Sequence, residues 1–464
     1  MSDLHYLPIT ELSKLIEARQ VSPIEATQAQ LDRIAALDDA LHSYALVTAD
    51  AAVIEARNAE RAIATGRRGG PLHGVPLGIK DLFWTAGVPT ANGTSIYRNF
   101  RPQEDATAVR RLREAGAILL GKLEMTEGAY SDHHPSVTPP VNPWHSSYWP
   151  GISSSGPGVA VAAGLCHGAI ASDTGGSIRW PAAANGITGL KPTWGRVSRH
   201  GVFELAASLD HVGVLARSAA DAGLILSAIA GHDPRDPTAL KAPVADIAMT
   251  DSDDLRGARV GIDRDWNGQD VDVRTQQVLK EAEEALGLLG AEVVEVRVPD
   301  VSDAVADWPS NCAVEAAVAH ERTYPSRKED YGPVLASVVE AGRALSGVDY
   351  QRILLRRMAL RGRFDALFKE IDLMLLPVHP FAPLTLETIR TLGEQPELVG
   401  KLQRYTCPFD MTGNPTITLP GGFDDADMPI GFQLAAGHLR EALLVRAGVA
   451  FQGATSWHRR HPDL

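Results

Sequence analysis

The sequence predicts an α/β fold in which helices cover a β-sheet on both faces, and three observations support this prediction. First, short apolar segments typical of buried strands, at 75–79 and 117–120, alternate in the middle of the chain with a helical pattern at 106–115. Second, the same alternation returns later in the chain. Third, 44% hydrophobic and 22% charged residues make an ordinary globular composition, and 464 residues can bury a large core.

The N-terminal region is expected to be helical. Over 9–41 apolar residues recur at helical spacing, and Ser22-Pro23 is typical of a helix cap followed by proline in the first turn, which predicts a helical hairpin. The pattern continues over 51–64 until Gly69-Gly70-Pro71 ends it. The other expected elements are helices at 158–165 and 273–289, strands at 260–262, 293–298, 372–377 and 415–420, a turn at Gly421-Gly422 and a surface connection at 232–254.

Bulk properties exclude several classes of protein. The chain has 44 Lys and Arg against 57 Asp and Glu, a net charge of −13, without the basic run that nucleic-acid binding needs. It begins without a basic segment before an apolar one, and the apolar stretch 159–170 is too short to span a bilayer, so we expect a soluble cytoplasmic protein without a membrane partner. Cys166, Cys312 and Cys407 are odd in number and far apart, so we expect them to be buried rather than paired or metal-bound.

The most unusual composition lies within residues 150–191. Two turns rich in glycine and serine, 151–156 and 173–179, flank one short helix of small residues. Glycines around a serine let backbone N–H groups approach a reacting oxygen, which is how an oxyanion hole for acyl transfer is built. Either turn alone is equally typical of an ordinary loop, but two of them around one helix favour a catalytic site.

A nucleophilic serine needs a base. The chain has neither a Gly-x-Ser-x-Gly nor a Ser-x-x-Lys motif, and His133-His134 lie in a Pro-rich loop, where we expect solvated or pocket-lining roles. Lys80 follows the apolar run 74–79, and a buried amine loses its proton more easily, so this lysine is a candidate base. The pattern alone also fits a solvated charge at a strand end, and both interpretations stay open at this point.

Several motifs in fixed order resemble the amidase signature family. They are the run 151–164, the Asp-Thr-Gly-Gly-Ser-Ile-Arg block at 173–179, Pro181-Ala182, the segment 189–193 and the lysine segment 74–81. Ser153 and Ser177 are 24 residues apart, which is the separation between the family's two catalytic serines. Further landmarks extend the resemblance over nearly the whole chain, at 142–144, 375–377, 412–415 and 429–434.

The resemblance implies the amidase signature fold, a large mixed, twisted β-sheet covered by α-helices on both faces. It implies a single domain over 1–464. Within it we expect N-terminal helices at 1–65, the catalytic core at 66–232, and a second half at 233–464 that completes the sheet and the substrate pocket.

The resemblance also implies a catalytic relay without a metal or organic cofactor. In the family's mechanism Ser177 is the nucleophile, Ser153 follows a cis peptide bond and bridges to Lys80, and Lys80 is the neutral base. The other implied site residues are an oxyanion hole of backbone N–H groups at Thr174, Gly175, Gly176 and Ser177, and the loop-orienting residues Ser154, Asp173 and Arg179.

Three positions depart from the family pattern. Ile152 replaces the usual glycine, which narrows the approach to Ser153. Pro157 replaces a small residue, and proline is tolerated in the first turn of a helix. Gly128 stands where many members carry phenylalanine, which predicts extra space beside the nucleophile unless a neighbouring side chain fills it. The other candidate pocket residues are Glu127, Ala129, Tyr130, Val141 and the loop 131–140.

We therefore predict a hydrolase of amide C–N bonds, with esterase or urethanase side activity, that acts as a monomer or homodimer. Its expected substrates are bulky or aromatic small molecules, such as the anilides of aryl acylamidases or carbamates and urethanes. One alternative is the amidase-like subunit of a glutamine-dependent tRNA amidotransferase, and another, a non-catalytic relative, conflicts with the presence of all three relay residues. A P-loop-like segment at 116–122 is set aside because Leu123 occupies its Ser/Thr position.

Overall fold

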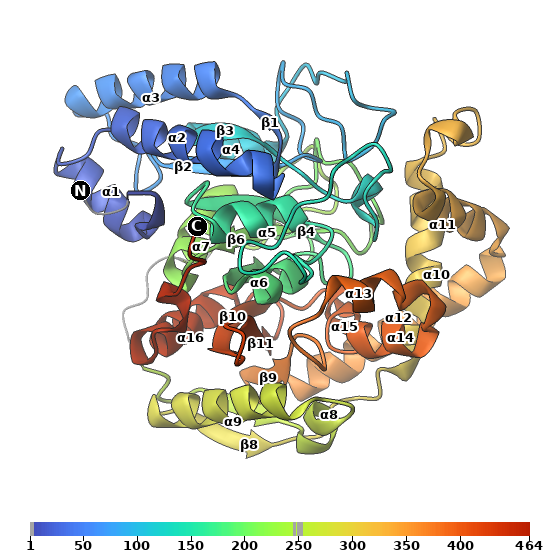
Figure 1. Ribbon diagram of the computed structural model, residues 1–464. Helices are drawn as coiled ribbons and strands as arrows, with labels where there is room; N and C mark the ends of the chain where they lie inside the picture. Colours follow the sequence, from blue (N-terminus) through green and yellow to red (C-terminus); the bar gives the residue numbers. More distant parts are fainter. Residues whose placement is uncertain (1–3, 245–246, 248–253) are drawn as a thin grey trace.

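The computed structural model describes residues 4–244, 247 and 254–464. Its described strands form one mixed 11-stranded sheet in the order β1-β3-β2-β4-β6-β5-β10-β11-β9-β7-β8 (Figure 1). The strands are β1 (Tyr44–Val47), β2 (Pro76–Lys80), β3 (Ile118–Leu123), β4 (Gly168–Asp173), β5 (Thr188–Lys191), β6 (His211–Ala216), β7 (Arg259–Ile262), β8 (Glu292–Glu295), β9 (Leu373–Pro377), β10 (Thr416–Phe423) and β11 (Pro429–Ala436).

The pairing of the strands changes along the sheet. β2 runs parallel to both β3 and β4, and β7 runs parallel to both β8 and β9. The pairs between β4 and β9 are antiparallel, as is the pair of β1 with β3. Parallel neighbours need a crossover, and helices lie between β2 and β3 and between β7 and β8 in the chain. The predicted mixed α/β class is therefore confirmed.

Helices pack around the sheet, and a helical group extends beyond it on the right of Figure 1. The α-helices are α1 (Ile9–Glu17), α2 (Pro23–Leu41), α3 (Ala49–Ala64), α4 (Thr107–Glu114), α5 (Ser155–Ala162), α6 (Arg179–Asn185), α7 (Ala219–Ile229), α8 (Arg264–Gly268), α9 (Val273–Leu288), α10 (Ser302–Ala319), α11 (Pro333–Ala344), α12 (Gly347–Leu367), α13 (Leu386–Arg390), α14 (Pro396–Gln403), α15 (Cys407–Thr412) and α16 (Glu441–Ala454). The 3-10 helices are η1 (Leu4–Tyr6), η2 (Glu127–Ala129), η3 (Lys328–Asp330), η4 (Leu392–Glu394) and η5 (Trp457–Arg459).

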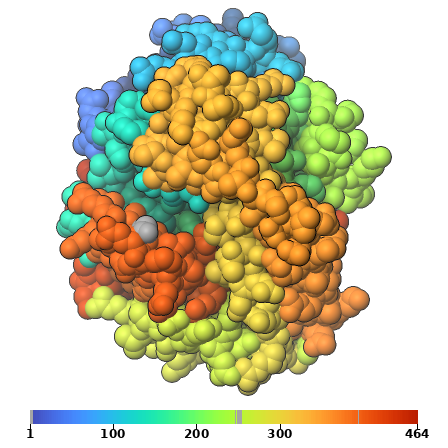
Figure 2. All heavy atoms as spheres, turned by 90° about the vertical axis from the view of Figure 1, so that its right-hand side faces the viewer, coloured from blue at the N-terminus to red at the C-terminus, as the bar shows by residue number. Residues whose placement is uncertain are grey.

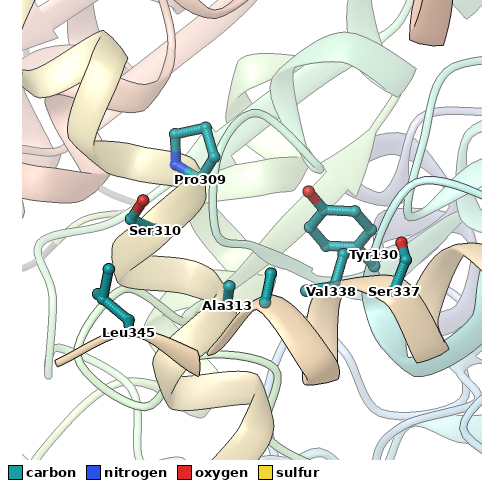
Figure 3. Close-up of a pocket in the computed structure, with 8 residues that line it drawn as sticks. Tyr130, Pro309, Ser310, Ala313, Ser337, Val338 and Leu345 are labelled. Atoms are coloured by element: carbon teal, nitrogen blue, oxygen red, sulfur yellow. The ribbon is translucent and has the colours of Figure 1, made fainter. Parts of the chain in front are cut away.

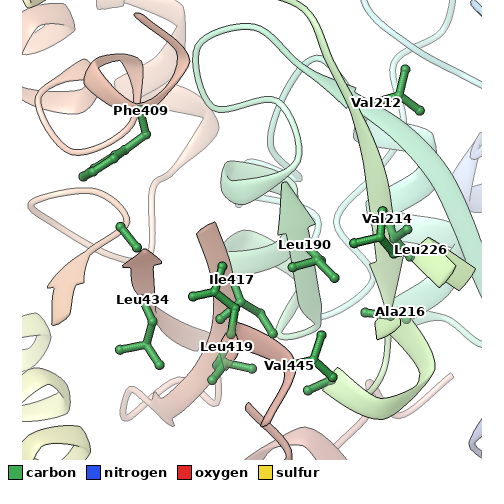
Figure 4. Packing of buried hydrophobic residues seen from close by; sticks show 14 of the residues in the cluster. Leu190, Val212, Val214, Ala216, Leu226, Phe409, Ile417, Leu419, Leu434 and Val445 are labelled. Carbon is green, nitrogen blue, oxygen red and sulfur yellow. The ribbon is translucent and has the colours of Figure 1, made fainter. Parts of the chain in front are cut away.

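Two hydrophobic cores lie on the two faces of the sheet. In β4, Ala169 and Ala171 belong to the core that includes α2, α3 and α5, whereas Ile170 between them belongs to the larger core with α7, α9 and α16. This alternation is what opposite faces of one strand produce. Figure 4 shows part of the larger core, where Leu190 of β5 and Val445 of α16 pack among neighbouring strands. The central strands are buried throughout because both of their faces are covered.

The expected N-terminal helices are confirmed. The hairpin over 9–41 is α1 and α2, and Ser22 forms a capping box with Glu25: Ser22 Oγ accepts from the Glu25 N–H at 3.1 Å and the Glu25 carboxylate accepts from the Ser22 N–H at 2.7 Å. The next helix, expected over 51–64, is α3, which begins at Ala49.

The turn predicted at Gly421-Gly422 is wrong. Both glycines lie inside β10, where the register with β11 shifts between Pro420 and Gly422. The two glycines thus lie at a local β-bulge, and the strand continues beyond them. The connection predicted at 232–254 falls partly outside the described residues.

The buried positions predicted for the cysteines are confirmed, since all three thiols lie inside the protein. Among the helices of residues 4–244 and 254–464, none is both long enough and apolar enough to cross a membrane.

Candidate active site

The sheet topology brings the predicted relay residues to one edge. Lys80 is the last residue of β2 and Asp173 the last residue of β4, and these strands are parallel neighbours, with Ile79 opposite Ile170. Their carboxyl ends therefore meet at the same edge of the sheet, where α/β proteins usually hold their ligands. The turn after β4 carries Ser177, and the segment before α5 carries Ser153.

Lys80 lies among three serine hydroxyls. Its Nζ is 2.8 Å from Ser153 Oγ and 2.9 Å from both Ser154 Oγ and Ser172 Oγ, and the lysine is fully buried. Burial lowers the pKa of Lys80 to about 7, against the opposing effect of Asp173 and Asp210. The amine can therefore be neutral near neutral pH, and Lys80 is not the solvated surface charge that the pattern also allowed.

The hydrogen bonds around Lys80 suit both of its protonation states. An ammonium has three N–H donors for the three serine oxygens. A neutral amine has two, so one hydroxyl must donate to it. Ser154 Oγ already donates to the Ser172 carbonyl oxygen at 3.2 Å, which leaves Ser153 or Ser172 as the donor to the neutral amine.

The two predicted catalytic serines differ in exposure. Ser153 is fully buried and follows a cis peptide bond with Ile152. Ser177 retains 8% of its surface, so of the three relay residues it alone reaches solvent.

Asp173 organises the turn that carries Ser177. Its carboxylate accepts hydrogen bonds from the N–H groups of Gly176 at 2.7 Å and Ile178 at 2.9 Å, and from Arg179 Nε at 3.0 Å and Nη2 at 2.8 Å. Burial alone would raise the pKa of Asp173, but the Arg179 guanidinium outweighs burial and holds that pKa well below its usual range. Arg179 also contacts Asp410 at 2.5 Å, which links the turn to α15.

The turn offers three unused backbone donors. Within the described part of the chain, the N–H groups of Thr174, Gly175 and Ser177 have no acceptor, whereas the N–H of Gly176 is bound to Asp173. Of the four oxyanion donors that the resemblance implied, three therefore remain available.

An apolar wall adjoins the relay. Ile152 and Trp180 are half-buried and pack with Phe381 against the buried residues Trp149 and Leu384. In Figure 2, teal residues lie set back between the gold segment near residue 330 and the orange segment near residue 400.

Side chains lie close to Gly128, where the sequence predicted extra space beside the nucleophile. A Cβ at Gly128 would lie 2.7 Å from Leu335 Cδ2, in α11, and 3.3 Å from Nε2 of His320, the residue directly after α10, so these side chains already occupy the space around it. The backbone at Gly128 is also left-handed, with φ of +57°, which side-chain-bearing residues rarely adopt. These contacts favour the alternative, in which a neighbouring side chain occupies the space.

The other candidate pocket residues are dispersed. Tyr130 lines a cavity of about 210 Å³ between α10 and α11, together with Ala313 and Val338 (Figure 3). The Glu127 carboxylate instead accepts from the N–H of Gly332, 3.0 Å from each of its oxygens. Of the remaining candidates, Ala129 is buried beside Gly128, and the Val141 N–H donates to the Leu41 carbonyl oxygen at 2.9 Å.

Two motifs set aside in the sequence have structural partners. Lys122, at the end of the P-loop-like segment, is buried and forms an ion pair with Asp81 at 3.2 Å. His133 lies 3.0 Å from Ser155 Oγ in the first turn of α5.

Sequence reasoning missed Ser172. Its hydroxyl contacts Lys80 as closely as Ser154 does, yet it lies in a strand of small residues that the apolar pattern did not reveal. The signal that could have identified Ser172 is its position directly before Asp173.

Comparisons with known proteins give one consistent result. The Amidase family model matches residues 25–445. The chain is 49% identical over 463 residues to the "Putative amidase AmiD" of Mycobacterium tuberculosis (strain ATCC 25618 / H37Rv), covering 99% of this chain and 96% of that protein. It is 37% identical over 490 residues to a glutamyl-tRNA(Gln) amidotransferase subunit of Moorella thermoacetica, covering 100% and 99%. The solved native peptide amidase of Stenotrophomonas maltophilia matches with a TM-score of 0.83 at 29% identity over 98% of both chains.

Proposed function

The chain belongs to the amidase family, and from this premise we propose that it hydrolyses the C–N bond of small-molecule amides through an acyl-enzyme on Ser177. One observation carries the proposal. A fully buried lysine with a pKa of about 7 lies 2.8 Å from the hydroxyl of Ser153, beside a turn whose Ser177 keeps 8% of its surface accessible. These are the requirements of a serine nucleophile served by a neutral lysine base.

In the first half of the proposed reaction, Ser177 Oγ attacks the carbonyl carbon of the amide. The new C–O bond displaces the carbonyl π electrons onto oxygen, which gives a tetrahedral oxyanion. Ser177 passes its proton to Ser153, and Ser153 passes its own to neutral Lys80. The hydrogen bonds allow this direction because Ser154 donates to the Ser172 carbonyl oxygen, so Ser153 is one of the two hydroxyls, with Ser172, that can donate to the neutral amine.

Collapse of the oxyanion then breaks the C–N bond. The leaving nitrogen takes the proton that returns from Lys80 through Ser153, and the acyl group stays on Ser177. Water attacks the acyl-enzyme, gives one proton to the same relay and releases the acid, which regenerates the Ser177 hydroxyl. The ammonium form of Lys80 has an oxygen acceptor for each of its three N–H groups, so the protonated intermediate keeps the same contacts.

We propose that the oxyanion is held by the backbone N–H groups of Thr174, Gly175 and Ser177. Removing one donor of such a hole typically costs about 100-fold or more in kcat. Gly176 is left out of this set because its N–H already donates to Asp173.

We further propose that the preferred substrates carry a bulky apolar group, as anilides and aryl carbamates do. The support for this substrate class is the half-buried wall of Ile152, Trp180 and Phe381 next to Ser153, since apolar surface beside a reaction centre favours apolar ligands. Gly128 adds no support, because the space beside it is filled.

The test is a hydrolysis screen over anilides, carbamates, esters and short aliphatic amides with the wild type and Ser177→Ala. We expect anilides and carbamates to have the highest kcat/KM, and Ser177→Ala to have no activity.

Ile152→Ala should lower kcat/KM for anilides about tenfold, because a branched side chain contributes roughly 1.5 kcal/mol of apolar contact, and should leave kcat/KM for acetamide unchanged. Ile54→Ala, at an exposed position, is the matched control. A preference for short aliphatic amides would refute the substrate class, and activity in Ser177→Ala would refute the mechanism.

A second candidate is the amidase-type subunit of a tRNA amidotransferase, which the 37% identity to the Moorella protein supports. Such a subunit would release ammonia from glutamine, a short polar amide. Hydrolysis of glutamine in preference to anilides, and only after partner subunits are added, would favour this candidate. Activity of the isolated chain on anilides would favour the first.

A further inference from the structure

The turn that carries Ser177 lies between two indole rings. A Cβ on Gly175 would lie 2.4 Å from Cζ2 of Trp308, and a Cβ on Gly176 would lie 2.7 Å from Cε2 of Trp180. Both positions therefore require glycine, because each peptide passes directly over an aromatic ring. Trp308 comes from α10, more than a hundred residues away in the chain.

Trp308 also makes a specific hydrogen bond to the turn. Its Nε1 donates to the Thr174 carbonyl oxygen at 2.8 Å, and the residue is only 7% exposed. In a planar trans peptide the C=O and N–H groups point in opposite directions. Holding the Thr174 carbonyl towards Trp308 therefore turns the N–H of Gly175 away from the indole.

A second side chain acts in the same way on the next peptide. Thr406 Oγ1 donates to the Gly175 carbonyl oxygen at 2.7 Å, and the N–H of Gly176 on the opposite side of this peptide donates to Asp173 at 2.7 Å. The orientations of both successive peptides are thus set by groups outside the turn. The Gly175 N–H, which has no acceptor among the described residues, remains for a ligand.

Resting on the proposed function of Ser177, we propose that Trp308 is a positioning residue, whose indole N–H aims the Gly175 N–H at the oxyanion formed during acylation. Thr406 supports the same geometry by holding the next peptide of the turn. Neither side chain touches the reacting atoms. Tyr130 stacks on Trp308 with ring centroids 6.4 Å apart and planes 13° apart, which keeps the indole in place.

This role differs from that of a residue that only fills space. A space-filling tryptophan is replaced adequately by phenylalanine, which keeps an aromatic ring but has no N–H. Phenylalanine does not replace a positioning tryptophan adequately, because without the indole N–H the Thr174 carbonyl loses its hydrogen bond and the 174–175 peptide can rotate. A misplacement of about 1 Å near the reaction centre costs on the order of 100-fold in rate.

The experiment compares the wild type with Trp308→Phe, Thr406→Val and Ser177→Ala. Thr406→Val keeps the branched shape of threonine and removes the hydroxyl, so it tests the same geometry with less change in packing. The probe is an alkyl fluorophosphonate, from which Ser177 Oγ displaces fluoride to form a tetrahedral adduct whose phosphoryl oxygen occupies the proposed oxyanion site. The readouts are the second-order labelling rate, kcat and KM on an anilide, and the thermal midpoint Tm.

We expect Trp308→Phe to lower both the labelling rate and kcat about 10- to 100-fold, with KM within about twofold of the wild type. Thr406→Val should lower them in the same direction. Trp457→Phe, the same change at a half-buried tryptophan of η5, is the matched control and should label at the wild-type rate.

Two sets of results are distinguishable. If Trp308→Phe and Thr406→Val are folded and label at the wild-type rate, or if only KM changes, the positioning role is overturned while Ser177 stands as the nucleophile. If the wild type is not labelled, or Ser177→Ala is, the proposed function itself fails, and the positioning role fails with it.

Discussion

Lys80 Nζ and Ser153 Oγ are 2.8 Å apart, with both side chains fully buried. A charged lysine in such a place has lost its hydration, and burial lowers its pKa from the usual value of 10.5 to about 7. Because Asp173 and Asp210 act in the opposite direction, the amine titrates close to neutral pH, where a base both accepts and returns a proton efficiently.

The first prediction is that activity rises with pH around this value. Lys80 must be neutral to accept a proton, and below a pKa of about 7 the ammonium form dominates. We therefore expect kcat/KM to fall about tenfold per pH unit below 7 and to level off above it. A pH profile of kcat/KM on an anilide measures this dependence.

Glu124 needs a control because burial raises its pKa to about 7 as well. Glu124→Gln should leave the midpoint of the profile where it is in the wild type. A profile that is flat between pH 5.5 and 8 in the wild type would contradict a neutral lysine base.

The second prediction concerns Ser172, whose hydroxyl is 2.9 Å from Lys80 Nζ. Ser172→Ala removes one acceptor of the ammonium form, so the pKa of Lys80 should fall and the midpoint of the pH profile should move to lower pH. One hydrogen bond to a charged group contributes about 1.5–3 kcal/mol, so we expect kcat to fall at least about tenfold.

Ser172→Thr keeps the hydroxyl and should restore both the midpoint and kcat. If the alanine variant has the profile of the wild type, Ser172 has no part in setting the state of Lys80.

The sequence predicted that Lys80 and Ser153 belong to one site, and the structure places them 2.8 Å apart. Lys80, Ser153 and Ser177 stand in motifs that resemble those of a known family, so this resemblance was visible in the chain itself. Their position at one sheet edge depends on β4, a short strand of small residues that hydrophobic periodicity did not detect.

Contacts across long sequence distances were beyond prediction. Trp308 and Thr406 reach the turn at 174–177 from α10 and from the residue before α15, and no local pattern links these segments to it. Leu335 likewise fills the space at Gly128 from α11, so a glycine in the sequence did not mean a cavity in the fold.

The third prediction concerns the buried ion pair of Asp173 and Arg179, which contact each other at 2.8 Å. Arg179→Met would leave the Asp173 carboxylate buried without its guanidinium partner. Breaking a buried pair from one side typically costs about 3–5 kcal/mol of unfolding free energy.

Urea denaturation at pH 7 measures this loss. Arg264→Met, which removes an exposed ion pair with Glu283, is the matched control and should cost less than about 1 kcal/mol. Equal losses of unfolding free energy in the two variants would show that the buried pair of Asp173 and Arg179 stabilises the protein no more than an exposed pair does.

The last prediction returns to Gly128. The backbone at Gly128 has a φ of +57°, which a residue with a side chain rarely adopts, and Leu335 Cδ2 lies 2.7 Å from the place a Cβ would take, so a larger residue is strained and also forces the Leu335 side chain to move. We therefore expect Gly128→Phe to lower Tm by several degrees, since overpacking typically costs about 1–3 kcal/mol. Adding Leu335→Ala should recover part of this loss by making room for the ring, whereas Leu335→Ala alone should destabilise by leaving a cavity. Thermal unfolding of the two single variants and the double variant separates these effects. A Gly128→Phe protein with the Tm of the wild type would show that the space beside η2 is open after all, and would revive the enlarged pocket as a determinant of substrate size.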